Sequence, residues 1–328
     1  MRRPATLLAS LIVSGAVAVQ TAAPAAAVTT SRIYGADRFA TAVEISKRHF
    51  PGTVDRVVVA SGEDFPDALG AGPLAAHFGA PLLLVPRDGV LPAKVATEIG
   101  RLKASSIEVV GGASVISDDM LKQLSSSAQP GGTAWRWAGK DRYETAARLA
   151  YGAPEGSTVF VSSGLGFADA LGGGAAAAHL GGPLVLTEPT RLPTSVSAVL
   201  KTIKPSKVVV LGGPTVVEDG VLQQISAALP GVVVERPAGK DRYATAAAVS
   251  AATFPQATTV YLAAGATFPD ALAGAPAAGS AGSPVLLTYK DCAPAATRAE
   301  IARLGATRVV ALGSTGVITD RALSLTPC

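Results

Sequence analysis

Metal-ligating and charged side chains are scarce in this chain of 328 residues. Two cysteines and three histidines leave little material for a zinc site, and we expect no metal and no cofactor. Charged residues make up 16% of the chain, and its formal net charge of +4 is small for a nucleic-acid-binding protein, which usually carries a basic stripe. Hydrophobic residues, at 48%, suffice for packed cores and exclude a wholly disordered chain.

Long apolar runs are also missing once the first residues are passed. No segment after residue 27 reaches 18 uninterrupted apolar residues, so we expect no transmembrane helix. The start is different, because Arg2 and Arg3 precede an apolar stretch over 5–19 and a run of small residues over 22–27. This pattern predicts a secretory signal peptide, residues 1–27, and an exported mature protein. A buried helix is the alternative interpretation.

Export makes disulfides possible, and Cys292 and Cys328 are the only candidates for a pair. A bridge between them would close a loop of 36 residues and tie down the end of the chain. It would contribute roughly 3 to 4 kcal/mol in the chain-entropy model. Two free thiols are the alternative.

The remainder of the chain consists of one unit repeated three times. A Gly-x-Asp-Arg-[Phe/Tyr]-x-Thr-Ala block begins at Gly35, Gly139 and Gly239. A Phe-[Pro/Ala]-Asp-Ala-Leu block begins at Phe65, Phe167 and Phe268, and an apolar run begins at Pro81, Pro183 and Pro284. Gly-Gly at 111–112 and 212–213 corresponds to Gly-Ser at 313–314. Copies of each block are 100 to 104 residues apart, which is the size of a small domain. We predict three repeats, over 28–130, 131–231 and 232–328.

Each repeat alternates helical and strand patterns. In the first repeat we predict helices over 37–50, 66–78, 92–102 and 118–124, and strands over 56–60, 82–85 and 107–110. A fourth strand precedes each Gly-x-Asp-Arg block, as over 232–236. Strands that are apolar on both faces and alternate with helices indicate a parallel sheet covered on each side. The predicted fold class is therefore α/β, with three tandem Rossmann-like or flavodoxin-like repeats built on small parallel sheets.

The repeated blocks place arginines and aspartates at one edge of each sheet. The motif loops follow strands and precede helices, so they gather at the carboxyl edge, where open α/β folds bind ligands. Each copy carries an aspartate and an arginine within the Gly-x-Asp-Arg block and a further arginine three residues before its glycine. These nine candidate binding residues are Arg32, Arg38, Arg136, Arg142, Arg236, Arg242, Asp37, Asp141 and Asp241. Arginine suits carboxylates and phosphates, which predicts an anionic ligand. Ion pairs that cap helices or lock the repeats together are the structural alternative.

In combination, the four blocks resemble the cell wall-binding repeat 2 family over residues 30–320. The resemblance implies a secreted Gram-positive protein that associates with the cell wall. It also implies a compact pseudo-threefold assembly and noncovalent attachment to an anionic wall glycopolymer. The sequence departs from the pattern at Ala168, Ala264 and Ser314, where a role assigned to the motif residue is in doubt.

Two further groups have structural and functional interpretations. Asp67, Asp169 and Asp270 follow the first position of a predicted helix, which favours structural helix capping, with a secondary site as the alternative. Trp135 and Trp137 flank Arg136 and could form a platform for stacking on sugar. The other repeats lack them, so core packing is the favoured interpretation.

Signals for catalysis are poor. The chain has no Gly-x-Ser-x-Gly block, and the matching residues His77 and His179 are replaced by Ser280 in the third repeat. We assign no catalytic residue and predict a noncatalytic wall-binding protein that recognises its polymer at several sites. A Rossmann-like enzyme or nucleotide-binding protein is one alternative. A surface-layer scaffold that binds other exported surface proteins is another.

Overall fold

The computed structural model describes residues 28–328, and the predicted signal peptide lies outside them. The first third contains β1 (Thr29–Ile33), α1 (Arg38–His49), β2 (Arg56–Ser61), the 3-10 helix η1 (Asp67–Gly70), α2 (Ala71–His77), β3 (Leu82–Val85), α3 (Ala93–Leu102), β4 (Ser106–Val110) and α4 (Asp118–Ser127). The second third contains β5 (Thr133–Trp137), α5 (Arg142–Ala150), β6 (Thr158–Ser163), α6 (Ala168–His179), β7 (Leu184–Thr187), α7 (Thr194–Ile203), β8 (Lys207–Val210) and α8 (Asp219–Ala228). The last third contains β9 (Val233–Glu235), α9 (Arg242–Thr253), β10 (Thr259–Ala264), α10 (Pro269–Ser280), β11 (Val285–Thr288), α11 (Ala295–Arg303), β12 (Arg308–Leu312) and α12 (Asp320–Leu323).

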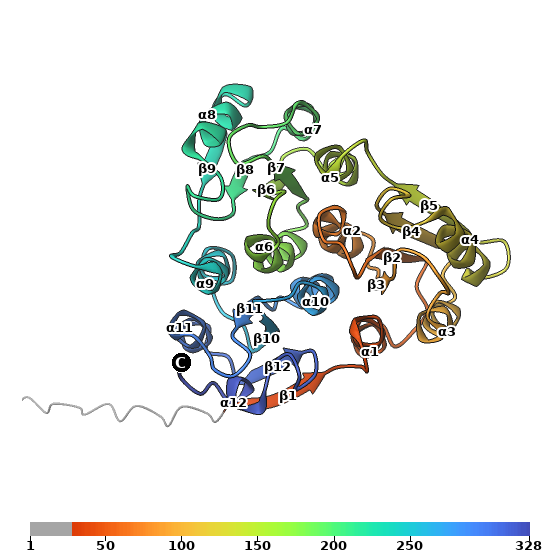
Figure 1. The fold of residues 1–328 in the computed structure, drawn as a ribbon. Helices are drawn as coiled ribbons and strands as arrows, with labels where there is room; N and C mark the ends of the chain where they lie inside the picture. The colour runs from red at the N-terminus through yellow and green to blue at the C-terminus, as the bar shows by residue number, and fades with distance from the viewer. Residues whose placement is uncertain (1–27) are drawn as a thin grey trace, which may run out of the picture.

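The strands form three four-stranded parallel sheets, which confirms the predicted fold class (Figure 1). Their strand orders are β3-β2-β4-β5, β7-β6-β8-β9 and β11-β10-β12-β1. Both faces of each sheet are covered. For example, the neighbouring residues Val57, Val58 and Val59 of β2 are all fully buried. Burial on both faces explains why the sequences of these strands are unbroken runs of β-branched residues.

The fourth strand of each sheet comes from the segment that leads into the next repeat. β5 pairs with β4, with Trp137 opposite Val110, although β5 lies in the second predicted repeat. β9 pairs with β8 in the same way. β1 pairs with β12, with Ile33 opposite Leu312, so the N-terminal strand completes the third sheet (Figure 1). The exchange therefore closes the three repeats into a ring.

Three helices, α2, α6 and α10, meet at the centre of the ring (Figure 1). Small residues allow their close approach, because a Cβ added at Gly279 of α10 would lie 2.4 Å from the Ala175 carbonyl oxygen of α6. The rings of Phe65, Phe167 and Phe268, which precede these helices, contact one another with centroids 5.4 to 5.9 Å apart. The central helices therefore start on the same face of the molecule, which gives the expected pseudo-threefold arrangement.

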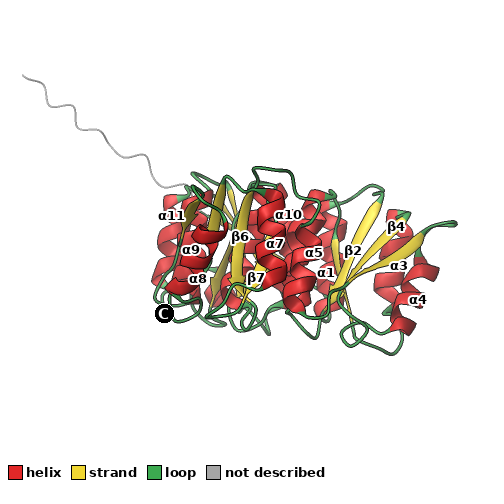
Figure 2. Cartoon of the chain, turned by 90° about the horizontal axis from the view of Figure 1, so that it is seen from above, coloured by secondary structure: helices red, strands yellow, loops and turns green. Residues whose placement is uncertain are grey.

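Helices and strands run between two faces that carry the loops (Figure 2). α1, α5 and α9 fill the gaps between neighbouring repeats: α1 packs on β3 and α10, α5 on β7 and α2, and α9 on β11 and α6. Each of these helices therefore joins its own repeat to the preceding one.

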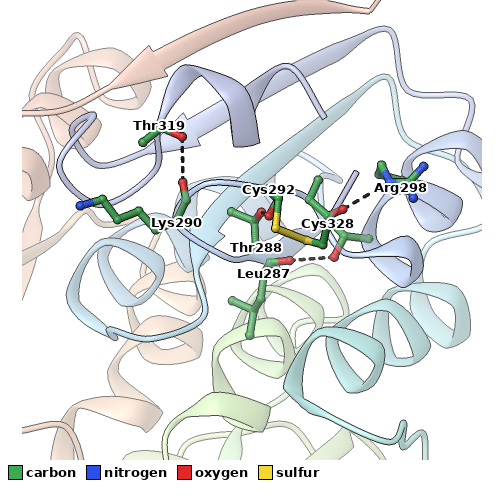
Figure 3. The surroundings of a disulfide bond; sticks show 9 residues. Leu287, Thr288, Lys290, Cys292, Arg298, Thr319 and Cys328 are labelled. Carbon is green, nitrogen blue, oxygen red and sulfur yellow. Dashed lines mark hydrogen bonds between the residues drawn. A yellow bond between two sulfur atoms is a disulfide. The ribbon is translucent and has the colours of Figure 1, made fainter. Parts of the chain in front are cut away.

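The predicted disulfide between Cys292 and Cys328 is present, with the two Cα atoms 4.9 Å apart (Figure 3). Its surroundings are ordered by hydrogen bonds, since the Thr288 hydroxyl donates to the Cys292 carbonyl oxygen at 3.0 Å. The bridge fixes the last residues beside the loop after β11. Across residues 28–328, no helix has the length and apolar character needed to cross a membrane.

Candidate functional site

The motif aspartates Asp37, Asp141 and Asp241 cap helices α1, α5 and α9. Each has an extended backbone and accepts a hydrogen bond from the backbone N–H three residues later, at 2.7 to 2.8 Å. Such caps typically contribute about 1 kcal/mol. This is the contact that the structural alternative predicts for these carboxylates, and it orders the loop that begins each helix.

Three arginines precede the motif glycine: Arg32 lies on β1, Arg136 lies on β5, and Arg236 directly follows β9. Their side chains are only 10%, 18% and 14% exposed. Each donates to the first carbonyl of the paired-glycine turn, at Gly313, Gly111 and Gly212 respectively. Each also pairs with an aspartate near the start of the following helix, at Asp320, Asp118 and Asp219, over 3.0 to 3.2 Å. These guanidinium groups therefore join the fourth strand to its sheet.

The second set of arginines, Arg38, Arg142 and Arg242, begins the three gap-filling helices. Each donates through one Nη to the carbonyl oxygen of a loop glycine in its own repeat, namely Gly62, Gly164 and Gly265. Within residues 28–328, none of the three forms an ion pair with a carboxylate. These guanidinium groups are thus oriented by one bond and keep charge available for a ligand.

Asp67, Asp169 and Asp270 lie in the first turn of η1, α6 and α10, and no side-chain capping bond is formed at any of these helix starts. Each carboxylate instead packs against a paired-glycine turn. A Cβ added at the first glycine of the turn would meet the aspartate Oδ2 at 3.3, 2.5 and 2.5 Å in the three repeats. These turns therefore need glycine both for a positive φ, between 94° and 119°, and for the close approach of the carboxylate.

The same aspartates face the next repeat around the ring. Burial raises the pKa of Asp169, against the lowering effects of the Thr245 hydroxyl and the Arg242 guanidinium. Burial also raises the pKa of Asp67, while neighbours that include Thr145 and Arg142 lower it. For Asp270, burial raises the pKa to about 6, against the lowering effect of Arg38. Each aspartate is thus coupled to the arginine of the following repeat, with the first repeat following the third.

Two of these repeat junctions are hollowed. Between the third and first repeats, Arg38, Thr41 and Asp270 line a hollow of about 160 Å³. Between the second and third repeats, Asp169, Arg242 and Thr245 line one of about 240 Å³. Both lie at the carboxyl edge of a sheet, beside the start of α1 or α9. A guanidinium group next to a helix N-terminus favours an anionic group.

The sequence pattern of a known family covers most of the chain. The pattern called Cell wall binding domain 2 (CWB2) matches residues 32–121, 136–222 and 236–323. The chain belongs to the CWB2 family. Its three repeats are cell wall binding domains. Each arginine hollow lies where two CWB2 repeats that are neighbours around the ring meet.

This CWB2 chain is similar to two curated proteins and to two proteins of solved structure. It is 29% identical over 290 residues to N-acetylmuramoyl-L-alanine amidase LytC of Bacillus subtilis, covering 88% of this chain and 56% of LytC. It is 30% identical over 269 residues to the Amidase enhancer of the same organism, covering 82% of this chain and 36% of that protein. Cwp6 and Cwp8 of Clostridium difficile share the fold, each with a TM-score of 0.81. Their identities are 25% and 29%, over 96% and 90% of this chain and 51% of each of theirs. The chain thus spans about half or less of these proteins.

The structure separates the predicted site residues into two groups. Arg38, Arg142 and Arg242 are brought near Asp270, Asp67 and Asp169 across the repeat junctions. Arg32, Arg136 and Arg236 are held in the sheets instead.

Sequence reasoning did not single out Thr41, Thr145 and Thr245 as site residues. Each is buried, and its hydroxyl accepts from the backbone N–H of the motif glycine at 3.0 to 3.2 Å. The signal in the sequence that could have identified these threonines is that all three repeats carry threonine at the same position of the block. Within the part of the chain that the structure describes, no cluster of His, Cys, Asp and Glu could hold a metal ion.

Proposed function

We propose that this chain is an exported, noncatalytic protein that attaches noncovalently to anionic cell wall glycopolymers. The observation that carries the proposal is the set of three equivalent guanidinium groups, on Arg38, Arg142 and Arg242. They lie on one face of a closed ring, and none is neutralised by an ion pair within residues 28–328.

The chemistry of the hollows supports an anionic ligand. A guanidinium group presents a fork of donors that matches phosphate and carboxylate oxygens. The adjacent helix N-termini add partial positive charge. The opposing aspartate is buried, and where its pKa is raised it carries less negative charge near neutrality than an exposed carboxylate does. These residues are suited to holding an anion rather than to transferring a group.

The ring geometry supports attachment at several points. Each site contributes a modest affinity, but a polymer that spans two or three sites binds the second and third intramolecularly. Exposed charge pairs are screened over about 8 Å at physiological ionic strength, so binding should weaken as salt is added. Multivalent attachment of this kind does not require a covalent bond to the wall.

The test removes the three guanidinium groups together. Arg38→Ala, Arg142→Ala and Arg242→Ala in one variant should abolish sedimentation with purified Gram-positive walls at physiological salt. A matched variant, Lys94→Ala, Lys201→Ala and Arg321→Ala, loses the same charge from exposed positions, one in each repeat and outside the hollows. It should sediment as the unaltered protein does.

Thermal unfolding of both variants shows whether they remain folded. A folded triple-arginine variant that sediments with walls as well as the matched variant would remove the arginine mechanism. Export is tested separately, by mass spectrometry of the protein released by cells. The predicted signal peptide requires an N-terminus near residue 28.

A further inference from the structure

A pair of adjoining hollows lies where the first sheet meets the second repeat, away from the arginine sites. The apolar one, of about 230 Å³, is lined by residues of α2 and α5, by the loop before β7 and by Trp137. The other is lined by Ser106, Glu108 and Trp135. Arg56 and Trp137 line both, so the two hollows adjoin and are treated together as one feature. In Figure 1 this place lies between β5, α2 and α5.

The polar part of the feature is built around one carboxylate. Glu108 has a side chain only 3% exposed, and it accepts hydrogen bonds from Arg56 at 2.7 Å, Ser106 at 2.8 Å and the Trp137 indole N–H at 2.7 Å. The Arg56 guanidinium also lies over the ring of Phe78, 4.5 Å from its centroid. The network holds the Trp137 ring and the half-exposed Arg56 in fixed positions.

The aromatic part faces solvent. Trp135 and Trp137 are two residues apart on the edge strand β5, so they lie on the same face of the sheet, and that face also carries Glu108. Trp135 is 62% exposed. The hollow between α2 and α5 has apolar walls, including Pro73, Leu74 and Leu149. A flat aromatic platform thus adjoins both fixed polar groups and an apolar recess.

The shared fold does not require these residues. Register places Val209 and Glu235 of the second sheet where Glu108 and Trp135 lie in the first. The third sheet has Val310 and Ser31 at the same places. Two of the three sheets therefore pack without a buried carboxylate, and without an exposed indole, at this point. Core packing alone does not explain the set in the first sheet.

We propose that this feature is a saccharide-binding site for an N-acetylated hexosamine unit. The C–H face of a pyranose ring stacks on indole, and the acetamido methyl group suits the apolar recess. Arg56 and Glu108 are placed to exchange hydrogen bonds with the ring hydroxyls and the amide. An apolar hollow with a few convergent polar groups is typical of small-ligand sites. The site is separate from the two arginine hollows and does not depend on the charge of the wall polymer.

The chain offers a direct probe, because it has only two tryptophans and both lie in this feature. Titration of the unaltered protein with the disaccharide diacetylchitobiose should change tryptophan fluorescence saturably and protect it from acrylamide quenching. Cellobiose, which lacks the acetamido groups, should have at least about fivefold lower affinity. The same affinity for cellobiose would overturn the assignment to an aminosugar, and no response to either sugar would overturn the site.

Trp135→Ala removes the platform at an exposed position and keeps Trp137 as the reporter. Its dissociation constant for diacetylchitobiose should rise at least about fivefold, whereas Trp135→Phe should retain most of the affinity. An unchanged constant in Trp135→Ala contradicts the stacking role. The Arg38, Arg142 and Arg242 triple variant should bind the disaccharide normally, so failure of this site and failure of the polymer-binding proposal are distinguishable.

Discussion

The paired-glycine turn after β8 provides a sharp test of how the repeat junctions are built. Gly212 has φ +94°, and a Cβ added there would lie 2.5 Å from Oδ2 of Asp169. An L-residue in left-handed backbone costs about 1–2 kcal/mol. The Asp169 carboxylate would also be displaced from Thr245, at a cost of about 1 kcal/mol for the lost contact. Gly212→Ala should therefore destabilise the protein by about 2–3 kcal/mol.

Gly213 is the matched control. It follows directly, its φ is not in the positive range, and an added Cβ would meet nothing within 4 Å. The described chain has 301 residues, from 28 to 328, so an unfolding entropy of about 2.1 cal/mol/K per residue gives a change in melting temperature of about 1.6 °C per kcal/mol. Gly212→Ala should melt about 3 to 5 °C below Gly213→Ala in differential scanning calorimetry. Equal melting temperatures would refute the close approach of the aspartate to the turn.

Three other predictions concern charge, cross-linking and ring closure. Burial raises the pKa of Asp270 to about 6 from 3.8, so its stabilising contribution is fully present below about pH 4 and is lost as the pH rises through 6. The free energy of unfolding of Asp270→Asn, measured relative to that of the unaltered protein, should therefore rise between about pH 4 and pH 7. The rise should reach up to about 3 kcal/mol in denaturant titrations. A difference between the two proteins that does not change with pH would contradict this. Replacing Cys292 and Cys328 by Ser should lower the free energy of unfolding by about 3–4 kcal/mol relative to the oxidised protein. The same denaturation midpoint in both proteins would disprove a stabilising contribution of the disulfide. Deleting residues 28–33 removes β1, the strand that pairs with β12. Amide hydrogen exchange in the third sheet should then accelerate, while the second sheet stays protected. Protection of the third sheet equal to that in the unaltered protein would contradict ring closure through β1.

Much of the architecture was predictable because it depends on local patterns repeated three times. Apolar runs such as 57–59 predicted the buried parallel strands. The position of each motif aspartate directly before a helix is typical of a helix N-cap. The Cys292–Cys328 bridge was predictable because the chain is predicted to be exported and contains no other cysteine.

The sheet that each fourth strand joins was not predictable from the repeats. A strand over 133–137 follows the predicted boundary between the first and second repeats, yet its hydrogen bonds go to β4 of the first repeat. Parallel pairing is nonlocal, and nothing within the strand's own residues specifies its partner. The exchange of β1 into the third sheet is the same effect over the whole length of the chain.

The two arginine sets illustrate a similar limit for the site. Arg32 and Arg38 each lie three residues from Gly35, and the sequence treats them alike. Arg32 lies in a strand and reaches the neighbouring turn, whereas Arg38 begins a helix and lines a hollow. The structural difference between the two arginines arises from the backbone that carries each side chain. The coupling of Asp270 to Arg38 depends on contact between the first and third repeats, 232 residues apart in sequence.

The charge of the wall is the most direct test of the proposed attachment. Unaltered protein should be sedimented with intact Gram-positive walls and should stay in solution with the same walls after extraction of their anionic polymers. Adding the extracted polymer to intact walls should compete the protein off. Undiminished retention on extracted walls would contradict polymer recognition, and loss of that retention after protease treatment would identify a surface protein as the partner instead.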